Sequence, residues 1–64
     1  MDRYVYNGPV EEFGRCVSNH WTATTYAVSE AKARSNFEYQ FKKQFNRAKN
    51  VKITLPGIIA RYPA

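Results

Sequence analysis

The feature that constrains the fold most is a row of phenylalanines in a segment that contains no glycine or proline, residues 30–48. At about 100° per residue on a helix, side chains four positions apart lie on one side. Ser29 precedes the segment as an N-cap residue. The segment therefore predicts an amphipathic helix that packs its phenylalanine side against a sheet. The side consists of Ala33, Phe37, Phe41, Phe45 and Ala48.

Alternation of side chains before the helix predicts the sheet. Residues 20–28 show it best, because they are rich in β-branched residues and place Trp21 on the same face as small residues. Residues 3–6 and 10–17 are two further predicted strands, with turns at Asn7-Gly8 and at Ser18-Asn19 and a bulge at Gly14. Residues 51–55 alternate again after the helix. The predicted fold class is α+β, a small antiparallel sheet in the order βββαβ with one amphipathic helix on one face.

The length of 64 residues allows one domain, residues 1–64, with a loosely held tail at residues 58–64. A domain of this size buries only about 60% of its unfolded surface. Ten aromatic residues compensate, and we expect an aromatic core under the sheet that includes Trp21. Cys16 is the only cysteine, so no internal disulfide forms. This favours the cytoplasm of a host cell, with a virion as the alternative location.

The sequence contains few of the residue types and motifs on which most enzyme chemistry depends. Cys16 and His20 are too few to ligate zinc, and a two-residue turn between them would place Cys16 opposite Trp21 rather than His20. Glu11 and Glu12 point to opposite faces of a strand, and no glycine-rich phosphate loop is present. We therefore expect a protein that is not an enzyme and that has no metal, cofactor, small-molecule substrate or membrane span.

The charge of the chain is uneven. The net charge is +5, but residues 1–31 carry −2 and residues 32–64 carry +7. Such asymmetry indicates an anionic partner for one surface. The candidate nucleic-acid-binding residues on the helix face are Lys32, Tyr39, Lys42, Lys43, Arg47 and Lys49. An aromatic ring among cations suits contact with phosphates and bases. The same pattern also fits a solvated helix face on which Tyr39 packs across lysine stems.

Two stretches of the sequence carry a family resemblance. The first is Tyr4-x-Tyr6-x-Gly8-Pro9-Val10. The second is Trp21-x-Ala23-x-Thr25-x-Ala27-x-Ser29-x-x-x-Ala33-x-x-Asn36-Phe37-x-Tyr39-Gln40-x-Lys42. Together they resemble a group of small uncharacterised proteins of phages and integrated mobile elements of low-GC Gram-positive bacteria. The resemblance implies a phage or mobile-element origin and leaves the activity open.

An architectural analogy offers a second candidate surface. Three strands followed by one helix is the layout of the small arm-type DNA-binding domain at the start of some integrases, in which the sheet enters the DNA groove. The predicted strand after the helix departs from that layout. The corresponding sheet residues would be Arg15, Thr22, Thr24 and Tyr26.

These observations leave two function hypotheses. The first is an accessory protein that binds nucleic acid through the basic helix face. The alternative is a protein-binding module, either a virion component or an inhibitor of a host enzyme or defence system. The apolar tail and the strand edges would dock that partner.

Overall fold

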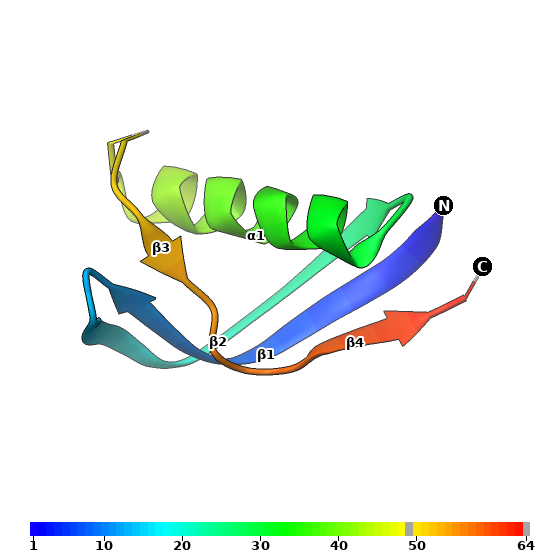
Figure 1. Ribbon diagram of the computed structural model, residues 1–64, viewed down its shortest axis with the longest axis horizontal. Helices are drawn as coiled ribbons and strands as arrows, with labels where there is room; N and C mark the ends of the chain where they lie inside the picture. Colours follow the sequence, from blue (N-terminus) through cyan, green and yellow to red (C-terminus); the bar gives the residue numbers. More distant parts are fainter. Residues whose placement is uncertain (49, 64) are drawn as a thin grey trace.

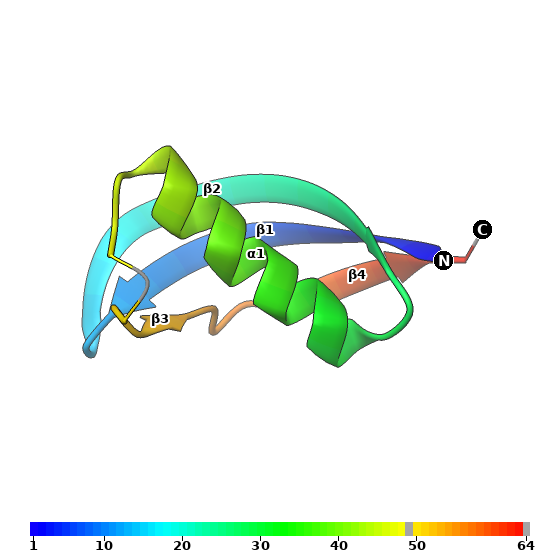
Figure 2. The same ribbon diagram turned by 90° about the horizontal axis from the view of Figure 1, so that it is seen from above.

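The structure is a computed structural model that describes residues 1–48 and 50–63 (Figure 1). Within these residues, the elements follow the order β1 (Asp2–Glu12), β2 (Arg15–Ala27), α1 (Glu30–Gln44), β3 (Ile53–Thr54) and β4 (Ile59–Tyr62). All strand pairs are antiparallel, and α1 lies across one face of the sheet (Figures 1 and 2). The predicted α+β class, a four-stranded antiparallel sheet with one helix, is confirmed.

The long hairpin of β1 and β2 differs from the predicted pair of short turns. Its turn is Phe13-Gly14, where both residues have positive φ, 52° and 79°. This conformation matches the twist of the flanking strands. The turn predicted at Asn7-Gly8 was wrong, since Asn7 pairs with Thr22 and Gly8 with Trp21 inside the hairpin. Continuous pairing over the whole length of β1 outweighs the local turn preference.

Two further expectations about the hairpin need correction. Ser18-Asn19 lies within β2 and forms no turn, so the N-terminal part of the chain holds two long strands rather than three. Gly14 belongs to the turn, and the register shifts occur between Gly8 and Glu11 instead. Pro9 lies in this irregular stretch, where the absence of an N–H is tolerated.

The second edge of β1 is shared by the two short strands that follow the helix. β3 pairs with Glu11 and Glu12, and β4 pairs with β1 from Arg3 to Tyr6. Residues 58–64, expected to form a loose tail, therefore contribute a strand. Ile59 is buried and Arg61 Nε donates to Asp2 Oδ2 at 2.7 Å, so both a core contact and an ion pair hold β4. The hydrogen bond to this carboxylate raises the pKa of Arg61.

The core fills the space between α1 and the sheet and is dominated by aromatic rings. Trp21, predicted to be core, is 6% exposed, and its Nε1 donates to Gln44 Oε1 at 3.2 Å. Its ring meets Phe41 edge-on at 5.2 Å between centroids, a favoured aromatic geometry. The buried residues are Tyr4, Tyr6, Val10, Trp21, Ala27, Ala33, Phe37, Phe41, Ile53, Leu55 and Ile59.

The helix begins as predicted and ends earlier than predicted. Ser29 caps it by accepting a hydrogen bond from the Lys32 N–H. At the other end, Asn46 adopts φ 56° and the Arg47 N–H donates to the Lys42 carbonyl at 2.7 Å. This is a Schellman motif, which stops a helix by reversing the chain. Phe45 is consequently the C-cap, 44% exposed, although its ring still packs on Phe41.

The sequence predicts a chain without a membrane span. No helix in residues 1–48 and 50–63 has the length and apolar character needed to cross a bilayer.

Candidate nucleic-acid interface

Four of the six candidate residues from the helix face meet at the C-terminal end of α1. They line one shallow hollow of about 230 Å³ and consist of Tyr39, Lys42, Lys43 and Arg47. We call these four residues the basic surface. Lys42 and Lys43 follow Tyr39 by three and four positions and share its side of the helix. The Tyr39 side chain is 61% exposed, so its ring is accessible beside the cations.

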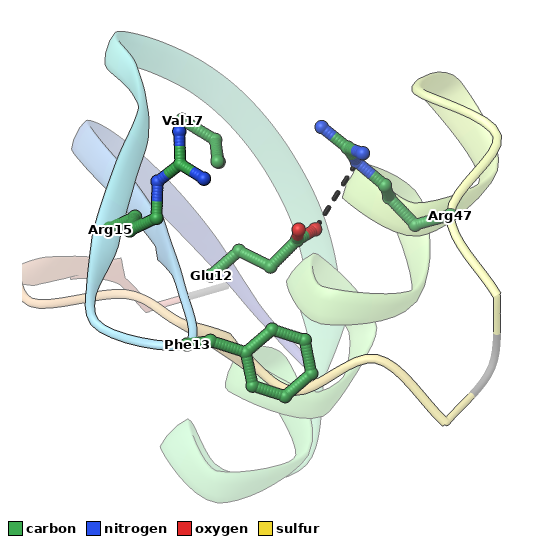
Figure 3. A pocket seen from close by; sticks show the side chains of 5 residues that line it. All are labelled: Glu12, Phe13, Arg15, Val17 and Arg47. Atoms are coloured by element: carbon green, nitrogen blue, oxygen red, sulfur yellow. Dashed lines mark ion pairs between the residues drawn. The ribbon is translucent and has the colours of Figure 1, made fainter.

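Arg47 reaches the basic surface because the chain reverses after Asn46. Its guanidinium Nε lies 3.3 Å from Glu12 Oε2 near the hairpin turn (Figure 3). The same oxygen is buried and accepts no hydrogen bond from residues 1–48 or 50–63. The two groups are thus an ion pair by distance, without the alignment of a hydrogen bond. Glu12 therefore offsets part of the positive charge of Arg47.

A second hollow, of about 420 Å³, adjoins the basic surface and shares Arg47 with it. Figure 3 shows its lining side chains converging from the hairpin and from the segment after α1. Arg15 brings a second guanidinium to this end of the molecule, and Phe13, which is 70% exposed, forms one wall. The lining residues are Glu12, Phe13, Arg15, Val17 and Arg47. Two arginines against one glutamate keep this end of the protein attractive to anions.

Lys32, another candidate from the helix face, is not part of this cluster. Lys32 lies in the first turn of α1, and eleven residues at 1.5 Å each separate it from Lys43 by about 16 Å along the axis. It lines neither of the two hollows. Lys49 lies outside the described residues. The helix face predicted from the sequence is therefore concentrated at one end of α1.

The second candidate set is split by the fold. Thr22, Thr24 and Tyr26 pair with Asn7, Val5 and Arg3 of β1, on the sheet face turned away from α1. Arg15 is at the far end of β2, in the hollow beside Glu12. The architectural analogy placed all four on one sheet surface, whereas the long strand β2 holds Arg15 and Tyr26 near its opposite ends.

Arg3 and Tyr62, two residues of the open sheet face, were not among the predicted site residues. Arg3 lies between Tyr26 on one neighbouring strand and Tyr62 on the other. No local pattern in residues 59–62 marks a strand, and the pairing of β4 with β1 is what brings Tyr62 beside Arg3.

The residues considered for metal or catalytic chemistry contact different partners in the described part of the chain. No cluster of three or more His, Cys, Asp or Glu side chains is found in residues 1–48 and 50–63. Cys16 Sγ lies 3.3 Å from the Ser18 carbonyl and 3.4 Å from Asn19 Oδ1, while His20 Nε2 contacts Thr22 Oγ1.

Comparison with known proteins adds no relative: no protein-family model, no curated protein and no solved structure matches the chain.

Proposed function

We propose that this chain is a small accessory protein, encoded by a phage or mobile element, that binds nucleic acid in the cytoplasm of a host cell. It acts by binding rather than by catalysis. One observation carries the proposal: the exposed ring of Tyr39 shares a hollow with Lys42, Lys43 and Arg47. Cations around an aromatic ring suit a ligand that combines phosphates with sugars or bases.

The charges of the basic surface indicate how tightly and how selectively it would bind. Two lysines and a partly compensated arginine neutralise only a few phosphates, which gives weak binding that falls steeply with salt. Lysine is a flexible point charge and reads no base pattern. The expected binding is therefore independent of sequence. The chain's net charge of +5 adds long-range attraction to any polyanion.

A titration against labelled DNA tests the proposal. Duplex and single-stranded oligonucleotides would be titrated by fluorescence anisotropy at about 50 mM and about 200 mM salt. We expect binding at the lower salt that weakens by one or more orders of magnitude at the higher. The double variant Lys42→Gln/Lys43→Gln should bind several-fold more weakly and show a smaller salt dependence, because fewer counterions are released.

A matched control separates the basic surface from net charge. Lys32→Gln/Lys52→Gln also removes two positive charges, from exposed positions outside the basic surface. It should leave duplex binding closer to wild type than the lysine pair does. Absence of binding at low salt, or equal losses in the two double variants, would show that the basic surface is not the interface.

A protein-binding module is the second candidate, and one observation favours it. β2 is an outer strand of the sheet, with β1 as its neighbour, and it runs for 13 residues. A long outer strand can accept a strand from a partner. Affinity purification from host lysate would distinguish the two functions. A stoichiometric protein partner that survives nuclease treatment would support this candidate over nucleic-acid binding.

A further inference from the structure

Three side chains form a row across the sheet face that α1 does not cover. Arg3 of β1 pairs with Tyr26 of β2 on one side and with Tyr62 of β4 on the other. The Arg3 guanidinium carbon lies 4.7 Å from the centre of the Tyr62 ring, a cation–π contact. We call Tyr26, Arg3 and Tyr62 the open-face row.

The row is exposed because side chains alternate along β1. Tyr4 and Tyr6 point to the helix side and are 3% and 0% exposed. Arg3, between Asp2 and Tyr4, must point the opposite way. Tyr26 is 62% exposed and Tyr62 is 47% exposed. Two large aromatic side chains thus remain accessible in a domain that buries most of its other rings.

The next rows of the same face are short, uncharged and partly polar. Val5 lies between Thr24 and Ala60, and Asn7 lies opposite Thr22. None of the paired positions in these rows carries a carboxylate. The face is therefore attractive to an anionic ligand through Arg3, and its small side chains leave the rings accessible from solvent.

We infer that the open-face row binds single-stranded nucleic acid by stacking. One unpaired base would lie on the Tyr26 ring, and another on the flat surface of the Arg3 guanidinium and the Tyr62 ring. Adjacent strands are about 4.8 Å apart, so Tyr26 and Tyr62 are roughly 10 Å apart across the sheet. This separation suits neighbouring or next-neighbouring nucleotides of an extended strand. Aromatic side chains on a sheet are a common means of binding unpaired bases.

The composition of the face favours this occupant over a protein. The buried centre of a protein interface is generally apolar. Here the charged Arg3 lies between the two tyrosines, and the next row combines Thr24 with the small side chains of Val5 and Ala60. A duplex is also a poor fit, because paired bases hide their faces inside the stack. The inference goes beyond the proposed function, since it concerns another face of the molecule and the bases rather than the phosphates.

The test compares single-stranded with duplex DNA. Wild-type protein and the variants Tyr26→Ala and Tyr26→Ala/Tyr62→Ala would be titrated at low salt with a labelled twelve-nucleotide oligothymidylate and with a duplex. Loss of one stacked base weakens binding about five- to hundred-fold. For the single strand, we expect a loss of that size with Tyr26→Ala and a larger loss with Tyr26→Ala/Tyr62→Ala. For the duplex, we expect little change with either variant.

Two controls make the result specific. Tyr26→Phe/Tyr62→Phe keeps the rings and should bind the single strand nearly as well as wild type. Ile58→Ala removes an 87% exposed apolar side chain and should change nothing. Circular dichroism would show that each variant is folded. Tyr26→Ala should disturb the fold less than the double variant does, because Tyr62 belongs to the short strand β4.

The outcomes for the two proposals are separable. If the duplex does not bind but the single strand binds in a Tyr26-dependent way, the open-face row stands and the basic surface fails. Wild-type affinity in Tyr26→Ala/Tyr62→Ala, or an equal loss in the phenylalanine variant, would overturn the inference. So would a wild-type dimer in sedimentation that dissociates when the tyrosines are removed, because the face would then be occupied by a second copy.

Discussion

Tyr6 joins distant parts of the chain through a single hydroxyl. Its side chain is fully buried, and its O–H donates to the Pro9 carbonyl while its oxygen accepts from the Gly57 N–H at 3.0 Å. A Cβ at position 57 would lie 2.9 Å from that oxygen. Glycine at 57 therefore allows the loop between β3 and β4 to approach the ring, and the hydroxyl connects this loop to the irregular stretch of β1.

Replacing Tyr6 by phenylalanine should destabilise the fold despite its small change in volume. The Gly57 N–H and the Pro9 carbonyl would both lose a partner in a buried place, which costs about 1–3 kcal/mol. Urea denaturation would measure the free energy of unfolding. Tyr39→Phe, at an exposed position, should leave that free energy nearly unchanged. Equal stability of Tyr6→Phe and wild type would show that the hydroxyl contributes little.

At the scale of elements, the helix and its core side were predictable and the strand boundaries were not. Phe37 and Phe41 are buried because their spacing matches the helical period, a local property of the sequence. The helix stops at Gln44 because Asn46 adopts positive φ, which asparagine tolerates but does not require. The pairing of β4 with β1 depends on residues more than fifty positions apart, and no local pattern of four residues reveals it.

In the candidate interface too, the features that depend on neighbouring residues were predictable, and those that depend on distant residues were not. Tyr39, Lys42 and Lys43 share a helix face, which is a local property of the sequence, and the structure places them around one hollow. The contribution of Arg47 depends on the chain reversal after the helix, and its pairing with Glu12 depends on the position of the hairpin turn. Long-range strand pairing likewise decided which tyrosines share the open face.

Removing β4 tests whether the C-terminal segment is part of the fold. Deletion of residues 59–64 removes the buried Ile59 and leaves the pairing edge of β1 at Arg3–Tyr6 without its partner. Burial of one isoleucine side chain contributes about 1.5–3 kcal/mol. A domain of this length is stable by only about 3–10 kcal/mol. We expect the truncated chain to lose several kcal/mol of stability or to be unfolded.

A shorter truncation is the control for this experiment. Deletion of residues 63–64 leaves β4 intact and should melt close to the wild-type temperature. Thermal unfolding followed by circular dichroism would compare the three proteins. If the longer deletion melts like wild type, residues 59–62 do not stabilise the domain.

At the scale of the whole molecule, one face of the sheet builds the core and the other remains available. The helix covers the first face, and its C-terminal end carries the basic surface close to the hairpin (Figures 2 and 3). The open-face row lies on the second face. The molecule thus separates a site suited to phosphates from a site suited to unpaired bases. This separation is what allows the two proposals to be tested independently.

The most direct measurement of the central claim is a residue-resolved titration. A ¹⁵N-labelled sample would be titrated with a short DNA duplex at low salt, and the amide chemical shifts would be followed by NMR. The account predicts salt-sensitive shifts concentrated at the end of α1 and after it, around Tyr39, Lys42, Lys43 and Arg47. Absence of shifts at low salt, or shifts that avoid these residues and follow the outer strand β2, would contradict it.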